Sequence, residues 1–486
     1  MTHSLIDGDI LTGTGDPVTI EDPVTGTLAA TYADGAAPAA TAAMDAAEAG
    51  GTAWRALTAS ARANILMDAA TKIRASAKTL AELEARTAAK PIRDCRVEVA
   101  KVAEMFAHYA GWADKILGDV VPVPTTHLNI VTREPLGTIV QLTPWNAPIF
   151  TAGWQIAPAL AAGNAVVIKP SELTPASTLA LAALVHEAGV PPGALNVVAG
   201  HGSTTGAALV CDPRAGKVVF IGSVPTGRKV AAAAASAGRP ALLELGGKSA
   251  NIVFADADLP RAAHTALGAI FGAAGQSCTA GARLLVERPV YDQMVEWVAT
   301  GAQNLCLGPP LDEATEVGPI NNRPQVTSVR AAIAAGEAAG ATRLGGTVPA
   351  ALSEGFFVAP TVFAGVTPKM PLANEEIFGP VLAVIPFDDE AEALAIANGG
   401  AFDLAGAVWT KNIMRAHRVA NALRAGTIWV NSYRALSVQT PFGGMLGSGF
   451  GRSSGADVMR EYTQSKSIWI ETDEGAVPPF GTAPTR

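Results

Sequence analysis

Cys278 and Glu244 are the residues whose types and surroundings best suit covalent chemistry. Cys278 lies in the segment 275–281, which contains two glycines, and Glu244 begins the segment 244–248, 34 residues upstream of Cys278. Small neighbours let a substrate or a cofactor approach the backbone closely. A sulfur nucleophile and a carboxylate base are the minimum needed for covalent catalysis on a carbonyl group.

A packing role is the alternative for Cys278, because buried cysteines commonly behave as small apolar residues. Cys95, Cys211 and Cys306 have apolar or proline-rich surroundings without a glycine-rich frame, and we interpret them as packing residues. The frame around Cys278 favours a reactive thiol there. Four cysteines without a pattern indicate a reducing compartment, so we expect a cytoplasmic protein.

Two glycine-rich turns each follow a predicted strand and open a predicted helix, which points backbone N–H groups at a phosphate. The turn 220–227, with Gly222, has the glycine spacing of a P-loop, but the lysine and the metal-binding hydroxyl of that motif are not in place. The turn 200–206, with Gly202 and Gly206, is similar to a dinucleotide fingerprint lengthened by one residue. Either turn alone is equally well structural, whereas the two together indicate a nucleotide.

Polar residues follow the predicted strand 165–168. Lys169, Ser171 and Glu172 stand at its carboxyl end, where a ribose binds in dinucleotide folds. A glutamate that accepts a hydrogen bond from the 2′-hydroxyl disfavours a 2′-phosphate, so NAD is the expected cofactor and NADP the alternative. Considered alone, Lys169 and Glu172 are equally well a solvated charge pair at the start of a helix.

Composition excludes several classes of protein. Charged residues make up 16% of the chain and apolar ones 49%, which is typical of a compact globular protein. The formal charge of −8 is spread along the chain without a basic cluster, so we expect no nucleic-acid partner. No ligand set has metal-site spacing, and we expect no metal. Prolines break the uncharged run 135–168, and residues 1–10 lack the parts of a secretory signal, so we expect neither a membrane span nor a signal peptide.

Hydrophobic patterns place the candidate pair between two α/β units. A helical region over 38–117 is followed by buried strands that alternate with helices, first at 136–142, 165–168, 194–198, 217–221 and 250–254, then at 284–287, 381–386, 405–409 and 427–430. Such alternation is typical of parallel sheets covered by helices. Because Glu244 lies at the end of the first α/β domain and Cys278 early in the second, we expect both at a domain junction, where ligands often bind.

With these pieces in order, the chain resembles the NAD(P)-dependent aldehyde dehydrogenase superfamily from about Thr19 to Ile470. The matching motifs are 144–146, 169–172, 222–223, 244–248, Phe271 with 275–278, 375–380 and 441–444. The resemblance implies an α/β fold with a Rossmann-like cofactor domain (1–117 and 135–246), an α/β catalytic domain (247–455), a small β oligomerisation flap (118–134 and 456–472) and a tail (473–486). It also implies a homodimer or a homotetramer.

The resemblance implies roles for single residues. Cys278 would attack an aldehyde, the Asn146 amide would hold the oxyanion, and Glu244 would activate water to release a carboxylic acid. The cofactor contacts that it implies are Trp145, Lys169, Ser171, Glu172, Gly202, Gly206, Gly222, Ser223, Leu245, Glu376 and Phe378. The substrate tunnel that it implies is lined by Ala147, Trp154, Ser277, Thr279 and Phe442.

This sequence departs from the family pattern near the catalytic glutamate. Gln155 and Ser453 stand where relatives commonly carry a lysine and a glutamate that relay protons. Because both charged residues are replaced together, neither charge is left unpaired. We therefore predict that Glu244 releases its proton through water or another route. Ala147 replaces an aromatic residue, which predicts a wider tunnel suited to bulky or cyclic aldehydes.

Two alternatives to an NAD-dependent, acid-forming enzyme remain at this point. One is an NADP-linked or CoA-acylating semialdehyde dehydrogenase, although a CoA-acylating enzyme can do without the base that Glu244 provides. The other is a catalytically silent homologue with a structural or binding role.

Overall fold

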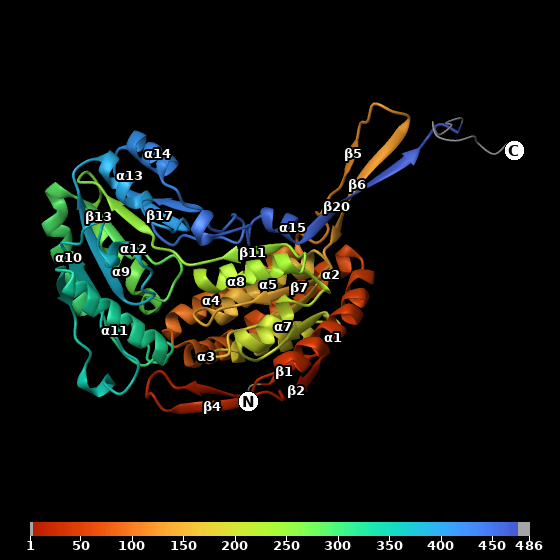
Figure 1. Cartoon of the computed structure of the whole chain (residues 1–486), viewed down its shortest axis with the longest axis horizontal. Coiled ribbons are helices and arrows are strands. Elements are labelled where there is room, and N and C mark those ends of the chain that lie inside the picture. The colour runs from red at the N-terminus through yellow and green to blue at the C-terminus, as the bar shows by residue number, and fades with distance from the viewer. Residues whose placement is uncertain (1–2, 475–486) are drawn as a thin grey trace.

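The computed structural model describes residues 3–474. Most strands of its larger sheet come from the amino-terminal half of the chain (Figure 1). Five parallel strands form the middle of this eight-stranded sheet, which has the order β19-β11-β10-β7-β8-β9-β1-β2. They are β7 (Thr138–Leu142), β8 (Ala165–Lys169), β9 (Leu195–Val197), β10 (Ala215–Ile221) and β11 (Ala241–Glu244). The antiparallel edges are β1 (Ser4–Ile6), β2 (Asp9–Leu11) and β19 (Gly449–Phe450).

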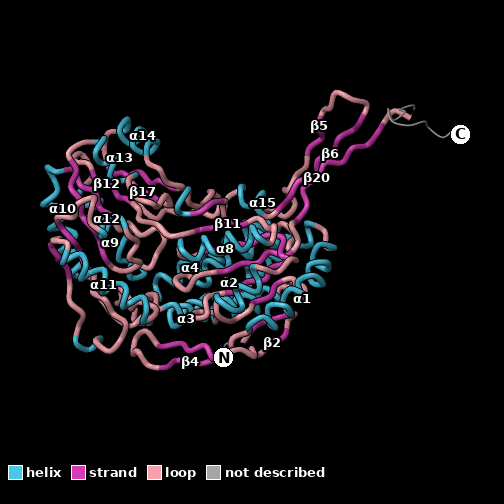
Figure 2. Tube along the Cα trace, viewed as in Figure 1, coloured by secondary structure: helices cyan, strands magenta, loops and turns pink. Residues whose placement is uncertain are grey.

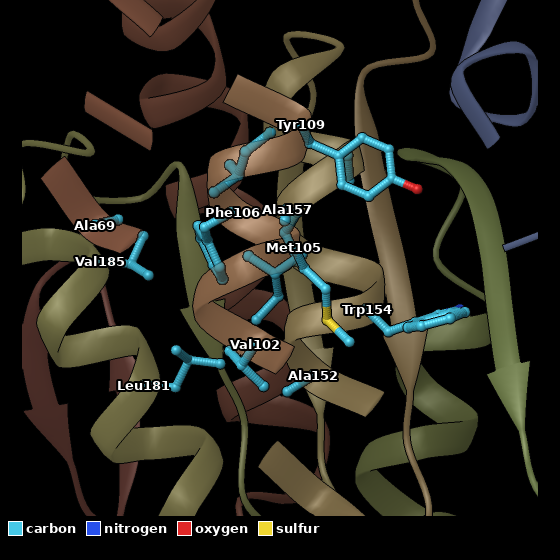
Figure 3. Packing of buried hydrophobic residues seen from close by; sticks show 14 of the residues in the cluster. Ala69, Val102, Met105, Phe106, Tyr109, Ala152, Trp154, Ala157, Leu181 and Val185 are labelled. Carbon is cyan, nitrogen blue, oxygen red and sulfur yellow. The ribbon is translucent and has the colours of Figure 1, made fainter. Parts of the chain in front are cut away.

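Helices cover this sheet and form two hydrophobic clusters with it (Figure 1). They are α1 (Ala36–Ala56), α2 (Ala59–Ala75), α3 (Ala77–Ala88), α4 (Ile92–Ala110), α5 (Pro148–Ala161), α6 (Ala176–Glu187), α7 (Ala207–Val210) and α8 (Val224–Ser236). Figure 3 shows Met105 and Phe106 of α4 packed beside α5, which carries Trp154. Every residue of α5 from Ala152 to Ala161 is buried, so this helix is held from all sides.

The second sheet has seven strands in the order β14-β15-β16-β13-β12-β17-β18. Its strands are β12 (Ala250–Val253), β13 (Arg283–Glu287), β14 (Thr342–Gly345), β15 (Thr361–Ala364), β16 (Val381–Phe387), β17 (Ala405–Trp409) and β18 (Thr427–Val430). All pairings are parallel except that of β14 with β15. Around it lie α9 (Leu259–Phe271), α10 (Tyr291–Asn304), α11 (Arg323–Ala338), α12 (Pro371–Asn374), α13 (Glu390–Asn398) and α14 (Ile413–Ala422).

A three-stranded antiparallel sheet projects from the body of the molecule (Figures 1 and 2). It consists of β5 (Asp119–Val121), β6 (His127–Pro135) and β20 (Thr463–Glu471), which follows the short helix α15 (Asp457–Glu461). β6 pairs with β20 over nine residues, from Thr463 with Pro135 to Glu471 with His127. A separate hairpin of β3 (Pro17–Glu21) and β4 (Leu28–Ala33) lies near the amino terminus.

The fold is α/β, as the sequence predicts, and the buried parallel strands lie within a few residues of the predicted ones. β11, whose last residue is Glu244, and β15 were not predicted as strands. After β18 the chain returns to the first sheet through β19, within the range predicted for the catalytic domain. No helix within residues 3–474 is long and apolar enough to cross a membrane, and residues 475–486 of the predicted tail lie outside the described part of the chain.

Candidate active site

The loop that carries Cys278 has an uncommon backbone. Directly after α9, Ala273 and Ala274 have φ of 52° and 53°, and Gly275 has φ of 74°. Alanine in the left-handed region costs energy and persists only where the surroundings hold it. At Gly275 a side chain is excluded, because a Cβ atom would lie 2.0 Å from the carbonyl oxygen of Gly379. The loop therefore requires glycine at position 275.

Two contacts bring Cys278 to the end of the first sheet. The Asn146 Nδ2 donates to the carbonyl oxygen of Gln276, two residues before Cys278, at 2.9 Å. Gly247 passes directly behind the cysteine, since a Cβ atom there would lie 2.3 Å from the Cys278 carbonyl oxygen. The glycines after Glu244 thus let the glutamate segment and the cysteine loop approach each other.

Glu244 is a buried carboxylic acid at the end of β11. It is 7% exposed, and its Oε1 has no hydrogen-bond partner within residues 3–474. Burial raises its pKa to about 8, although the positive charge of Arg452 opposes the shift. A carboxyl with a pKa near neutrality is suited to act as a general base.

Cys278 is half-buried, and its thiol holds its proton firmly. Burial raises its pKa to about 12, and the negative charges of Glu244 and then Glu376 add to the shift. Arg434 acts in the opposite direction. A carboxylate and a thiolate in this site therefore disfavour each other.

One continuous cavity of about 930 Å³ contains both groups. Of the predicted residues, it is lined by Trp145, Asn146, Ala147, Trp154, Gly222, Ser223, Glu244, Leu245, Ser277, Cys278, Thr279, Glu376, Phe378 and Phe442. A second group, Lys169, Ser171, Glu172, Gly202 and Gly206, lies outside this lining. The structure thus divides the predicted residues into two places.

The second group gathers at the carboxyl ends of β8 and β9. Lys169 Nζ donates to the carbonyl oxygen of Gly200 at 2.7 Å and lies 3.5 Å from the Glu172 carboxylate. Gly206 lies against the Lys169 side chain, since a Cβ atom added to this glycine would be 3.4 Å from the lysine Cδ. The glycine-rich turn and the charged pair, which the sequence analysis treated separately, therefore form one cluster.

The turn 200–206 already holds an anion of its own chain. The Asp34 carboxylate accepts hydrogen bonds from the backbone N–H of His201 at 3.0 Å and from the Thr205 hydroxyl at 2.7 Å. Thr204 donates to the same carboxylate. The donors of this turn are thus directed at Asp34 and not at a phosphate, which gives the turn a structural role.

The first turn of α8 is the better phosphate site. Ser223 is its N-cap residue, and its hydroxyl donates to the Thr226 hydroxyl at 3.1 Å without capping a backbone N–H of the helix. Ser223, Val224 and Pro225 line the cavity. Helix N-termini attract anions. The residues present therefore fit the pyrophosphate of a dinucleotide.

The other end of a dinucleotide also finds suitable groups. Phe378, with φ of 55°, packs edge-on against Trp145 at 5.4 Å between ring centroids, which provides an apolar wall. Glu376 Oε1 accepts from the Gly247 N–H at 2.9 Å, and a Cβ atom on Gly246 would lie 2.0 Å from its other oxygen. An aromatic wall beside a carboxylate fits a nicotinamide and its ribose.

Gln155 and Ser453 do not contact each other. Gln155 Oε1 accepts from the Tyr462 hydroxyl at 2.6 Å, and Ser453 Oγ accepts from Trp154 Nε1 at 2.8 Å. Both are fully buried. Neutral hydrogen bonds to Tyr462 and Trp154 thus occupy the two positions where relatives commonly carry charges.

Three residues near the site were missed by the sequence analysis as site residues. Arg434 lines the cavity, Arg452 affects the pKa of Glu244, and Tyr462 lies close enough to Glu244 for that charge to raise its own pKa. They come from the segment 431–462, which returns to the site only through the fold. The sequence signal was weak, since a lone arginine in a loop is usually solvated.

Comparison with known proteins settles the family. The model of the Aldehyde dehydrogenase family matches residues 11–468. The chain belongs to the aldehyde dehydrogenase family. The predicted resemblance, fold class and aldehyde-oxidising activity are confirmed.

Several aldehyde dehydrogenases are similar over most of their length. Betaine aldehyde dehydrogenase of Bacillus subtilis is 41% identical, with 87% of each chain covered. Human retinal dehydrogenase 2 is also 41% identical, over 87% of this chain and 82% of its own. The crystal structure of PnpE from Pseudomonas sp. WBC-3, solved with nicotinamide adenine dinucleotide, has a TM-score of 0.96, 40% identity and 99% coverage of both chains. The predicted cofactor, NAD, is thus the one bound in a relative of the same fold.

Proposed function

We propose that this aldehyde dehydrogenase forms a carboxylic acid, with Cys278 as nucleophile, Glu244 as base and Asn146 as oxyanion donor. The supporting observation is that one cavity contains all three, with Asn146 bonded to the loop of Cys278. An intact set of this kind argues against a catalytically silent homologue.

The chemistry begins at the sulfur. The Cys278 thiol gives its proton to a base, for which the Glu244 carboxylate is available in the same cavity. The sulfur then forms a bond to the aldehyde carbon, so the carbonyl oxygen becomes an oxyanion. The second N–H of the Asn146 amide and the backbone N–H of Cys278 stabilise that oxygen; removing one such donor typically costs about a hundredfold or more in rate. NAD, when bound, would supply the hydride acceptor; loss of hydride from the former aldehyde carbon re-forms the carbonyl and leaves a thioester on Cys278.

Hydrolysis of the thioester is the step assigned to Glu244. Its carboxylate takes a proton from water, the water oxygen bonds to the thioester carbon, and the bond to sulfur breaks to give the acid and the free cysteine. The buried oxygen of Glu244 without a partner is available for that proton. A product assay separates this reaction from acylation of CoA.

The cofactor is held by residues that line the cavity and by the cluster of Lys169 and Glu172 outside that lining. Ser223 and the first turn of α8 hold the pyrophosphate, Glu376 the nicotinamide ribose and Phe378 the nicotinamide. The cluster of Lys169 and Glu172 holds the adenosine ribose, and Glu172 favours NAD over NADP. Gly202 and Gly206 shape that cluster without binding phosphate.

The assembly and location are part of the same proposal. We propose a cofactor domain (1–117 and 135–246), a catalytic domain (247–455) and a flap (118–134 and 456–472) that joins subunits into a homodimer or a homotetramer. The three larger sheets support this division, although β19 of the first sheet lies within 247–455. A cytoplasmic location is supported by four free cysteines.

The test is NADH formation from a panel of aldehydes, with NADP and CoA as alternative co-reactants. Wild type should produce NADH and a free acid, and Cys278→Ala should produce neither. Cys211→Ala, which changes an exposed cysteine, serves as the control and should keep its activity. Absence of NADH with every aldehyde would favour the silent homologue instead.

A further inference from the structure

Arg434 is held in a fixed position on the substrate side of the cavity. It follows β18, has φ of 59° and lines the cavity beside Gly268 and Gly272. Its neighbours anchor the loop, since the Tyr433 hydroxyl donates to the Thr279 carbonyl oxygen at 3.1 Å and Trp429 Nε1 donates to that of Ala435 at 2.8 Å. A side chain at positive φ between two anchors is positioned by the fold.

The first anchor also joins Arg434 to the nucleophile. Thr279 directly follows Cys278, so the bond from Tyr433 fixes the arginine loop against the cysteine loop. The positive charge of Arg434 is near enough to lower the pKa of the thiol. A substrate bound to Cys278 thus has Arg434 within the same chamber.

The guanidinium of Arg434 is short of partners. Its one hydrogen bond is a 3.3 Å contact from Nη1 to the carbonyl oxygen of Gly268, and no carboxylate of residues 3–474 lies within ion-pair distance. A guanidinium has five N–H donors in a fixed fork. Arg434 is half-buried. A cation that is partly removed from water without a counter-charge is unfavourable, and a ligand that supplies the counter-charge would offset that cost.

The other cations of the cavity wall are paired. Lys90 lies 3.1 Å from Glu84 and also contacts Glu98, and Arg93 lies 3.5 Å from Asp94. Asp94 and Glu98 act on Arg434 only through longer-range attraction. Arg434 is therefore the lining cation, within the described residues, that has donors left for a ligand.

The remainder of the substrate side suits a carbon chain. Phe150 stacks on Trp154 at 5.1 Å between centroids, and Phe442 meets Trp154 edge-on at 6.0 Å. Aromatic faces of this kind also attract a cation such as a quaternary ammonium. The positive charge of Arg434 in the same chamber opposes that ligand and favours an anion.

We propose that Arg434 binds a carboxylate at the end of the substrate away from the aldehyde, so that the preferred substrates are semialdehydes of dicarboxylic acids. This inference rests on the proposed function, because it concerns the substrate that Cys278 attacks. A fork of N–H donors that matches two carboxylate oxygens gives both affinity and orientation.

The test compares aldehydes that differ in charge but not in length. The anionic series is succinic, glutaric and adipic semialdehyde, the neutral series is butanal, pentanal and hexanal, and betaine aldehyde is the cation. We expect kcat/KM of wild type to be at least tenfold higher for the best semialdehyde than for its neutral match, and lowest for betaine aldehyde. The advantage should shrink as ionic strength rises.

Two variants place the effect on Arg434. Arg434→Gln should lower the ratio of anionic to neutral kcat/KM at least tenfold, mainly through KM, and Arg434→Lys should retain part of it because lysine keeps the charge without the fork. The matched control is Arg96→Gln on α4, where an exposed arginine pairs with Glu313 outside the cavity. Its ratio should equal that of wild type.

The outcomes separate the inference from the proposed function. NADH from neutral aldehydes with a ratio near one in wild type, a preference for betaine aldehyde, or an equal loss for all aldehydes in Arg434→Gln would overturn the role of Arg434 and leave the proposed function standing. If Arg434→Gln does not fold, the wild-type ratio and its salt dependence decide. No NADH from any aldehyde would remove both.

Discussion

Burial raises the pKa of Glu244, and burial and then the charge of Glu244 raise that of Cys278, which links both chemical steps to pH. With a pKa of about 8, Glu244 is mostly protonated at neutral pH and cannot accept a proton from water. As pH rises through about 8 the carboxylate forms, and the base needed for hydrolysis of the thioester becomes available. The sign follows from burial, which favours the neutral acid.

The first prediction concerns Glu244→Gln. We expect a burst of NADH of about one per active site followed by a steady rate lower by about a hundredfold or more, because the thioester forms but hydrolyses slowly. In wild type the steady rate should rise with pH through about 8, and in the variant that rise should disappear. Stopped-flow absorbance measures both phases; a variant with the steady rate of wild type would show that another group is the base.

Gln155 and Ser453 bear on how Glu244 releases its proton. Gln155 accepts a hydrogen bond from Tyr462, and Ser453 accepts one from Trp154. Both bonds join neutral groups, so these two positions provide no charged pair next to Glu244. The Gln155 Nε2 and the Gln141 Oε1 have no partner within residues 3–474, which leaves polar atoms free to bind water behind the active site. Water is accordingly the simplest route for the proton.

The second prediction is that restoring the charged pair changes the pH profile. The double variant Gln155→Lys with Ser453→Glu should shift the pH at which the steady rate is half-maximal. Each single variant should be less stable than the double one, because it buries an unpaired charge. Steady-state rates over a pH series and urea midpoints provide the measurements. An unchanged profile in a folded double variant would contradict the proposed route.

At the scale of elements, an ion cluster joins α3 to α4 under the substrate side of the cavity. Lys90 is 2% exposed and lies between Glu84 of α3 and Glu98 of α4. Its pKa is raised by these carboxylates although burial opposes the shift, and burial raises that of Glu98. Removing the cation would leave two buried acids without their counter-charge.

The third prediction follows from that cluster. Lys90→Met should destabilise the protein by about 3–5 kcal/mol, the usual cost of breaking a buried pair from one side. Lys101→Met is the matched control on α4, where Lys101 forms an exposed pair with Glu104; its effect should stay under about 1 kcal/mol. Denaturant unfolding measures both, and equal effects would mean that the cluster is energetically ordinary.

At the scale of the whole molecule, the strands that were predicted correctly are those with a clear apolar pattern in their own few residues. The buried parallel strands gave continuous apolar runs, because both faces of a parallel sheet are covered, and β8, β10 and β16 lie where those runs lie. β11 has only four residues and merges with a glycine-rich segment, so its pattern was too short to indicate a strand.

Long-range geometry was beyond the reach of local patterns. Nothing near Arg434 in the sequence indicates that a tyrosine bond would bring its loop to Thr279. The turn 200–206 carried the spacing of a phosphate loop, and only the folded chain shows that Asp34, more than 160 residues upstream, fills it. The resemblance to a family supplied the pairing of Cys278 with Glu244, since spacing alone left a packing cysteine as the alternative.

The projecting sheet exposes apolar side chains that nothing else in the described part of the chain covers. β20 is a nine-residue edge strand with exposed apolar side chains, including Trp469 at 54% and Ile470 at 44% exposure. A long apolar edge invites another strand, and three strands standing away from a core are marginal without a partner. Association between subunits would bury this edge.

The last prediction is therefore the loss of assembly in a flap variant. Trp469→Arg with Ile470→Asp should convert a homodimer or homotetramer into a smaller species, because charges in place of the apolar edge must be desolvated on association. The control is Ile413→Arg, which changes an exposed isoleucine at the start of α14, away from the flap. Light scattering after size exclusion gives the masses. Wild type that elutes as a monomer, or a flap variant with the mass of wild type, would assign the projecting sheet another role.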